Sequence, residues 1–430
     1  MNNNALEPRQ VLQTPDCEAV DERKIISRAG HLGTDRMMDP GRACKRKRFP
    51  QVTRWQAIGL LGLAASVMPA HSSLASEWRW SGDIRAGLFA SERTARDGAE
   101  SDDRFLRGRL RLGGERDLSE EWLFRARAAG RYGGGQDGTS TYLRGYAPTA
   151  TGAELGDTTL DELYLRYAPS GADWSLRVGR FQAKFELPGV PAKSLSRNDS
   201  PNIDITWTDG VHLVAPVADG WKGHLILQHN HRHGTGTTAR SPLDFSDSGS
   251  RAGVFVGLEA KSNPAFPVRM IDLTWLPDAL ASEGVAQDRR EDYLAASGRA
   301  STAWPLGSGG MKLVAGGEIG YAFRTPFGSA AGTGETGRSD GLAWQIGPSL
   351  YDIWPGHHIG VVYGRTGAGW LISPDFRPND ELMEVRYQWR FTSKWSMEAR
   401  LRQREEITIP STASRERVDR DLYIRVTGRF

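Results

Sequence analysis

Residues 418–430, with the sequence VDRDLYIRVTGRF, decide the fold class. Taken in steps of two back from the last residue, one side of this stretch carries Phe430, Gly428, Val426, Ile424 and Leu422. The other side carries Arg429, Thr427, Arg425, Tyr423 and Asp421. This period of two predicts a β-strand with one apolar and one polar face. Because the sequence stops on the aromatic residue of this strand, we expect Phe430 itself to occupy a structured position.

One segment near the start of the chain has the character of an export signal. The basic residues Lys45, Arg46, Lys47, Arg48 and Arg54 precede the apolar run 57–67, which is followed by Pro69 and the small-residue stretch 73–75. This order is typical of a secretory signal peptide, and the apolar run is too short to span a bilayer. We therefore predict a signal peptide at 42–75, cleaved after Ala75, in preference to a buried core helix. Residues 1–41 are predicted to be a disordered leader or upstream sequence from a mis-assigned start, and 76–430 is the predicted folded domain.

The composition of the exported domain excludes several classes of protein. The mean hydropathy of the chain is −0.49, so long apolar helices do not dominate it. Of the 55 Lys and Arg residues 11 precede Ser76, and of the 52 Asp and Glu residues 7 do, which leaves 44 basic and 45 acidic side chains. This near-neutral balance does not support nucleic-acid binding. Both cysteines, Cys17 and Cys44, also precede Ser76, so we expect an exported fold stabilised without disulfides, as a closed hydrogen-bonded barrel is.

From Ser76 onward the sequence repeats a run of about ten alternating residues followed by a break. The sixteen runs are 78–88, 104–115, 122–132, 159–168, 174–183, 209–215, 221–228, 253–259, 268–276, 292–304, 311–323, 341–350, 358–364, 379–391, 395–405 and 418–430. Breaks after even-numbered runs are short turns, whereas breaks after odd-numbered runs are longer and polar, such as 91–103, 133–158 and 230–251. We therefore predict an all-β fold, a transmembrane antiparallel β-barrel of about sixteen strands with short periplasmic turns and long extracellular loops. A soluble sandwich has no reason to sort its loops in this way.

Tryptophans are placed where an interfacial girdle would need them. Five begin predicted strands that leave the periplasmic side: Trp78, Trp122, Trp174, Trp221 and Trp395. Three more, Trp275, Trp304 and Trp389, are predicted near the ends of strands that return to it.

Alternate residues of a strand point to opposite faces of the sheet, so each strand has one set of residues toward lipid and one toward the interior. We place the apolar set of each strand against lipid. The outward set of the first three strands is Trp78, Trp80, Ile84, Ala86, Leu88, Leu106, Leu110, Leu112, Trp122, Phe124 and Ala126. The arginines then face inward, because an Arg at mid-membrane on the lipid side costs about 2 to 4 kcal/mol. The predicted pore-lining residues are Arg79, Arg85, Arg107, Arg109, Arg111, Arg125, Arg127, Arg386, Arg390, Arg400, Arg402 and Arg425. Asp83, Glu162, Glu384 and Glu398 are available to pair with them, so the arginines either stabilise the wall or attract anions.

The final strand resembles the closing strand of bacterial outer-membrane β-barrels, whose last residue is usually Phe. A second resemblance is carried by LRVGRF at 176–181, the long break 184–207 and TDGVHL at 208–213, which look like the third-loop region of sixteen-stranded porins, including phosphate-selective types. The resemblance implies a loop folded into the lumen, with Glu186, Lys193, Arg197, Asp199 and Asp204 at a constriction. A surface loop is the alternative. Arg180 shares parity with Val178, which predicts either a bulge near Gly179 or an error in the register assigned to this strand.

Other chemistry finds little support in the sequence. His229, His231 and His233 alternate and could hold a divalent metal, but parity places them on the outward face, so no metal site and no cofactor is predicted. No serine, histidine and carboxylate set is singled out for catalysis.

We expect a passive channel, not an enzyme, in the outer membrane of a Gram-negative cell. Its expected partners are membrane lipid and small anionic or polar solutes, with a homotrimer as one option for its assembly. An alginate-export-type barrel is the second choice, and a barrel enzyme or an adhesin is the third.

Overall fold

The chain forms a closed antiparallel β-barrel in the computed structural model. The structure describes residues 78–134, 142–143, 157–231, 250–281, 290–331, 333 and 336–430. The predicted leader and signal peptide at 1–41 and 42–75 lie outside these residues. Within them, no helix has the length and apolar character that crossing a membrane requires.

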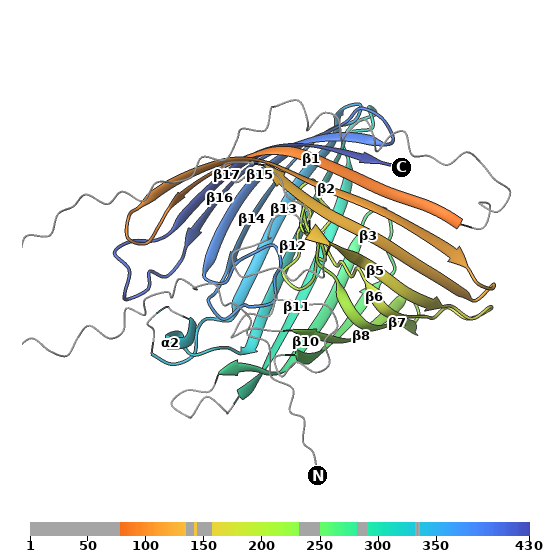
Figure 1. Cartoon of the computed structure of the whole chain (residues 1–430), viewed down its shortest axis with the longest axis horizontal. Helices are drawn as coiled ribbons and strands as arrows, with labels where there is room; N and C mark the ends of the chain where they lie inside the picture. The colour runs from red at the N-terminus through yellow and green to blue at the C-terminus, as the bar shows by residue number, and fades with distance from the viewer. Residues whose placement is uncertain are drawn as a thin grey trace, which may run out of the picture. The chain divides into compact units, whose positions relative to one another are not determined.

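Sixteen long strands make the wall of the barrel (Figure 1). They are β1 (Trp78–Thr94), β2 (Glu100–Asp117), β3 (Trp122–Gly134), β5 (Asp157–Tyr167), β6 (Ser175–Phe181), β7 (Thr208–Ala218), β8 (Trp221–His231), β9 (Ser250–Ala260), β10 (Val268–Ala281), β11 (Arg290–Pro305), β12 (Lys312–Arg324), β13 (Leu342–Trp354), β14 (His357–Thr366), β15 (Asp380–Arg390), β16 (Trp395–Glu406) and β17 (Val418–Arg429). Two small elements are added, β4 (Tyr142–Leu143), parallel to β5, and the helical turn α2 (Gly328–Ala331). Each of the sixteen predicted runs corresponds to one long strand, so the fold-class prediction is confirmed.

The ring closes where β1 pairs with β17. Their antiparallel register runs from Asp83 opposite Arg429 to Thr94 opposite Val418. The N–H of Gly82 donates to the carbonyl of Phe430 at 2.9 Å, and the N–H of Phe430 donates to the carbonyl of Gly82 at 3.2 Å. Neither strand therefore presents a free edge along this seam. The expectation that Phe430 occupies a structured position is confirmed.

Side-chain exposure follows the predicted parity. On β1 the outward residues Trp80 and Leu88 are 61% and 66% exposed, whereas the inward Arg109 of β2 is fully buried. Ile424 on β17 is exposed, and its inward neighbour Tyr423 is buried. The apolar side chains thus cover the outside of the wall while charged groups face the interior, as a barrel in lipid requires.

Connections at the two ends of the barrel differ in length. We call the end that carries Phe430 the turn end, where the connections are 118–121, 168–174, 219–220, 261–267, 306–311, 355–356 and 391–394. The opposite loop end carries the connections 95–99, 182–207, 367–379 and 407–417, and the described residues 325–331, 333 and 336–341 of one more. The first of these is much shorter than the predicted 91–103, because β1 and β2 stay paired up to Thr94 opposite Glu100. Beyond the apolar belt both faces are polar, so the alternation that marks a strand disappears from the sequence.

Two local predictions are wrong. The ladders on both sides of β6 run without a register shift, so there is no bulge near Gly179. Instead Gly179 has φ +125° and faces Gly210 with φ +152° on β7, a conformation that suits glycine.

Trp275 lies toward the loop end and not the turn end, because β10 begins at the turn 261–267. Its indole N–H donates to Asp292 at 3.0 Å.

Candidate functional site

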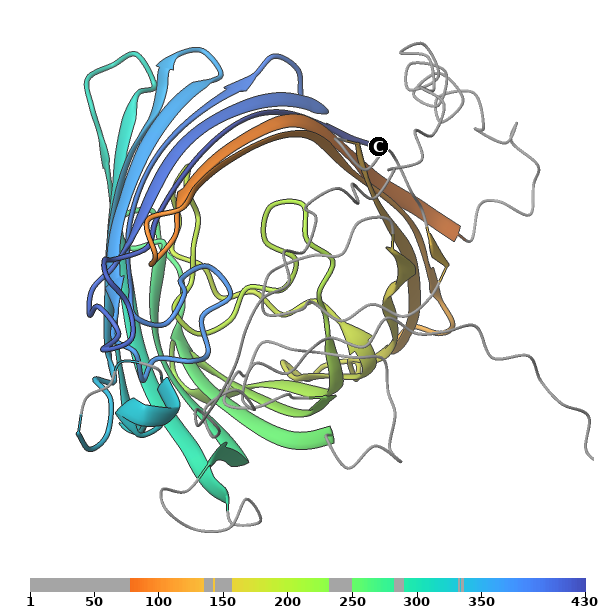
Figure 2. The same cartoon turned by 60° about the vertical axis from the view of Figure 1, so that its left-hand side comes forward.

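The connection 182–207 folds into the barrel, as Figure 2 shows. Residues 193–200 are all buried, although they belong to no strand. The backbone N–H of Leu195 donates to Glu318 of β12 at 2.9 Å, and that of Val190 donates to Ser349 of β13 at 3.0 Å. These contacts with the inner faces of distant strands exclude the alternative of a surface loop.

Two ion-pair networks attach the middle of this loop to the wall. The Lys193 ammonium lies 2.9 Å from a carboxylate oxygen of Glu384 on β15. Arg299 of β11 pairs with Asp272 and Glu318, and it donates to the hydroxyl of Ser196 at 2.6 Å. Breaking one partner of a buried charged network leaves the other charge uncompensated, which is strongly destabilising. The loop is therefore a fixed part of the interior.

Arginines of the wall bind the loop where it crosses from one side of the barrel to the other. Asn202 and Asp204 accept hydrogen bonds from strands β1, β2, β3 and β17. The donors are Arg85 and Arg425 for Asn202, and Arg109 (3.1 Å) and Arg131 (3.3 Å) for Asp204. Part of the arginine wall thus holds protein oxygens.

A second inward connection, 367–379, lies beside the first. Trp370 is fully buried, and its indole N–H donates to the carbonyl of Leu195 at 2.9 Å. Leu371, Ile372 and Phe376 belong to the same apolar cluster. This inward loop was not predicted, although the apolar residues 370–372 in a polar break were a signal that it packs against the interior.

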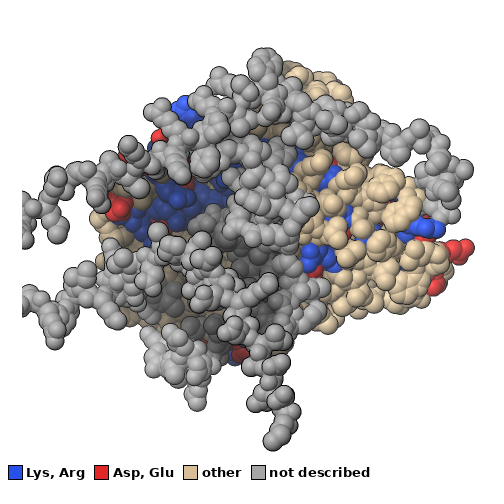
Figure 3. Space-filling view, in the orientation of Figure 1, with Lys and Arg blue, Asp and Glu red and all other residues tan. Residues whose placement is uncertain are grey.

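The two loops and the wall enclose a basic cavity of about 630 Å³. Twelve arginines border it: Arg85, Arg93, Arg107, Arg377, Arg386, Arg390, Arg400, Arg402, Arg404, Arg420, Arg425 and Arg429. Lys184 and Lys193 add to them, whereas the acidic residues on its border are Asp103, Glu186, Asp204, Asp375, Glu398, Asp419 and Asp421. A dense group of basic side chains is visible in the opening on the left of Figure 3. Positive charge is therefore in excess around this space.

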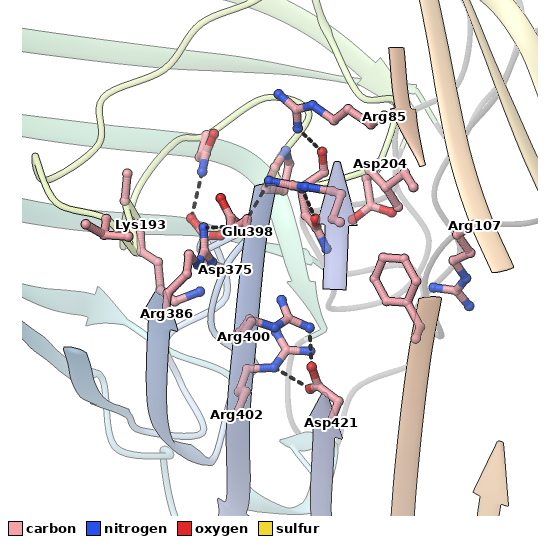
Figure 4. Close-up of a pocket in the computed structure, with 18 of the residues that line it drawn as sticks. Arg85, Arg107, Lys193, Asp204, Asp375, Arg386, Glu398, Arg400, Arg402 and Asp421 are labelled. Carbon is pink, nitrogen blue, oxygen red and sulfur yellow. Dashed lines mark hydrogen bonds and ion pairs between the residues drawn. The ribbon is translucent and has the colours of Figure 1, made fainter. Parts of the chain in front are cut away.

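Shared carboxylates hold the cavity arginines of the last strands in pairs. Arg400 and Arg402 of β16 converge on Asp421 of β17, at 2.6 Å for Arg402 (Figure 4). Arg386 and Arg425 share Glu398, at 3.4 and 3.0 Å. A guanidinium in such a pair has a fixed position and keeps donors for a further oxygen.

The predicted pore-lining arginines fall into two groups. Seven border the cavity: Arg85, Arg107, Arg386, Arg390, Arg400, Arg402 and Arg425. The other five lie outside its border: Arg79, Arg109, Arg111, Arg125 and Arg127. Arg111 and Arg127 both pair with Asp161, while Arg125 pairs with Glu115 and Glu162. Arg79 pairs with Glu115 and Asp117 near the turn end, so this second group mainly joins neighbouring strands.

The five residues predicted at the constriction also divide. Glu186, Lys193 and Asp204 border the cavity. Arg197 instead donates to Thr208 at 2.8 Å, and Asp199 accepts from the N–H of Ala183 at 2.9 Å, so both residues lie at the root of the loop. Residue alternation predicts the direction of side chains only in a strand. In this irregular loop the sequence alone could therefore not separate the cavity residues from those at the loop root.

Burial inside the barrel shifts the pKa values of charged residues in the first loop. It lowers the pKa of the Lys193 ammonium to about 8, although Glu384 opposes the shift. Burial likewise lowers the pKa of Lys184 and raises that of the Glu186 carboxyl. Each shift follows from the cost of placing a charge away from bulk water. The charge that the loop presents to the cavity therefore depends on pH.

A histidine pair on the inner wall was not anticipated. His212 Nε2 of β7 lies 3.2 Å from His224 Nδ1 of β8, and His224 Nε2 lies 3.0 Å from Glu259. Of the predicted alternating histidines, His229 belongs to β8, whereas His233 lies outside the described residues. Among the residues that the structure describes, no three metal-ligating side chains are grouped to hold an ion.

A solved structure supports this architecture. OprB of Pseudomonas putida is 12% identical over 83% of this chain and 95% of its own, with a TM-score of 0.54. Pseudomonas aeruginosa OccK8 (OprE) and OpdL are each 13% identical over 82% of this chain and 98% of their own, with TM-scores of 0.46 and 0.48. At this identity, OprB supports the fold alone. No protein-family model matches the sequence. No curated protein matches it either.

Proposed function

We propose that the protein is an outer-membrane channel through which small hydrophilic solutes diffuse passively, with a preference for anions. Its apolar outer face suits acyl chains, and its polar interior requires water. In this orientation the turn end is periplasmic and the loop end extracellular. The protein then works without chemical turnover and depends on no cofactor.

The observation that carries the anion preference is the charge around the cavity. Twelve arginines and two lysines border it against seven carboxylates. A low-dielectric wall that carries an excess of one sign raises the local concentration of oppositely charged solutes. Guanidinium groups also match the geometry of carboxylate and phosphate oxygens, so organic acids and phosphate are the first solutes to test.

An exporter for an anionic polysaccharide, like the alginate-export type, would share an arginine wall. The two inward loops favour the smaller solutes, because a buried ion pair and hydrogen bonds to the wall hold the first loop across the lumen and the second packs against it. A chain of sugars would need a continuous wide passage. The homotrimer remains a prediction from the sequence.

Conductance of the purified protein in planar bilayers tests the proposal. We expect a steady single-channel current and a reversal potential in a potassium chloride gradient that shows chloride to be the more permeant ion. Phosphate or a small carboxylate added to one side should reduce the chloride current by competing for the arginines. A membrane-inserted protein without conductance, or one that prefers potassium, would contradict the proposal.

A further inference from the structure

The two inward loops are joined at one carboxylate. Asp375, in the loop 367–379, accepts a hydrogen bond from the backbone N–H of Ser194 at 3.0 Å and another from the side-chain amide of Asn198 at 2.9 Å. The same oxygen, Oδ2, accepts both bonds. Asp375 is almost fully buried, and it borders the cavity. Hydrogen bonds to an ionised carboxylate are stronger than those between neutral groups.

Asp375 is itself held in place by its own loop and by the wall. Ser373 accepts hydrogen bonds from the N–H groups of Asp375 (3.2 Å) and Phe376 (3.0 Å), which fixes the turn. The Ser373 hydroxyl donates to the carbonyl of Ser194 at 2.8 Å. Arg404 of β16 donates to the Asp375 carbonyl at 2.7 Å. The carboxylate therefore connects the first loop to a rigid element.

The segment that Asp375 holds carries a cation of the cavity. Lys193 immediately precedes Ser194, and its ammonium reaches the border of the cavity beside Glu384. On the opposite side of the segment, the N–H of Leu195 is bound by Glu318. Without the Asp375 carboxylate, the segment would stay attached through Glu384, Glu318, the Ser373 hydroxyl and the indole N–H of Trp370. The N–H of Ser194 and the side-chain amide of Asn198 would then lose their acceptor, and the backbone next to Lys193 would be held by fewer bonds.

We propose that Asp375 is a positioning residue that fixes Lys193 and Asn198 at the cavity and so sets the bore and the ion preference of the channel. This inference rests on the proposed function, and it assigns a specificity role to the second loop. Two effects of Asp375 are separable. Its oxygen holds the segment, and its negative charge reduces the anion preference.

Three variants separate these effects. D375N keeps an oxygen that can accept both hydrogen bonds but removes the charge. D375A removes both the oxygen and the charge. D97A is the matched control, because Asp97 lies in the exposed hairpin 95–99 and accepts a bond from the N–H of Ala99 at 2.9 Å without reaching the cavity. Each protein is purified in detergent as the folded barrel.

Hydrogen exchange at the Ser194 amide and bilayer conductance are measured on all three. We expect D375A to exchange about tenfold faster at Ser194, because a buried amide loses its acceptor, and to show an altered conductance with a noisier open state. D375N should keep the exchange rate and conductance of the wild type within about twofold while its reversal potential shifts toward anions. D97A should match the wild type in every measurement.

Equal exchange at Ser194 in D375A and the wild type would overturn the proposal, as would fast exchange in D375A with unchanged conductance. If D375A does not fold, N198A takes its place, since it removes one of the two bonds and leaves the second loop intact; it should exchange faster than the wild type. A wild type that exchanges slowly at Ser194 but forms no pore would refute the proposed function and leave the hydrogen-bonded connection demonstrated.

Discussion

Replacing Asp421 by asparagine should strengthen the anion preference of the channel. Asp421 is the only carboxylate bound to both Arg400 and Arg402 among the described residues, and all three border the cavity. Asparagine is nearly isosteric and keeps one oxygen as an acceptor for a guanidinium. The substitution therefore removes one negative charge while disturbing the packing little.

Coulomb's law gives the size of the effect. A unit charge acting on an ion about 7 Å away in water contributes about 0.6 kcal/mol, and screening at 0.1 M salt, where the Debye length is about 10 Å, reduces this to about 0.3 kcal/mol. Anions are then enriched, and cations depleted, by a factor of about 1.6 each. The anion-to-cation permeability ratio should rise about threefold in D421N.

Reversal potentials in a potassium chloride gradient measure this ratio, and a charge-balanced double variant controls it. In D421N/R402Q the lost negative charge is matched by a lost positive charge, so an electrostatic effect should return to the wild-type value. A structural effect should not, because R402Q does not restore the two ion pairs that D421N removes. An unchanged reversal potential in D421N, or a shift toward cations, would refute the assignment of these arginines to the conducting path.

Three further predictions address the lipid face, the loop and the backbone. Ile424→Arg should destabilise the barrel by about 2 to 4 kcal/mol in lipid vesicles, measured by denaturant unfolding, whereas Ile424→Ala should cost less because it brings no charge into the bilayer. Anion preference should fall as the pH rises through about 8, where Lys193 becomes neutral, and this step should be absent in Lys193→Gln. The pKa of Lys193 in the folded protein lies below the usual 10.5, so between about pH 8 and 10.5 the unfolded chain binds more protons than the folded one. The free energy of unfolding should therefore rise with pH in this range, and this rise should be absent when Lys193 is replaced. Gly210→Ala should lower the free energy of unfolding by about 1 to 3 kcal/mol or more, since its Cβ would lie 2.0 Å from the carbonyl oxygen of Leu227 at φ +152°; an unchanged denaturation midpoint would contradict the strain argument.

The wall of the barrel was predictable because its pattern has a physical cause at every residue. A strand between lipid and water must alternate, so parity alone placed Leu88 outside and Arg109 inside. The pattern ends where the lipid ends, which is why β1 and β2 were predicted too short. Gly179 and Gly210 show a second limit, since a positive φ changes the direction of a side chain without inserting a residue.

The loops were less predictable because their positions depend on tertiary partners. Lys193 and Arg197 are four residues apart in a polar break, yet one borders the cavity and the other binds Thr208 at the loop root. The partners that decide this, such as Glu384 and Thr208, lie on strands far apart around the ring. The composition of the loop shows that it is charged, and only the fold shows which charges meet.

In the proposed anion-preferring channel, the pairing of charges, and not the number of arginines, decides which part of the wall would attract anions. On β2, β3 and β5 three guanidiniums meet three carboxylates: Arg111, Arg125 and Arg127 with Glu115, Asp161 and Glu162. On β15, β16 and β17, together with the inward loop, five cations share three carboxylates: Lys193, Arg386, Arg400, Arg402 and Arg425 with Glu384, Glu398 and Asp421. Of these two groups of paired residues, the second has more cations than carboxylates. Anions should therefore follow the wall formed by the last three strands, and charge reversal there should alter permeation more than the same change on β3.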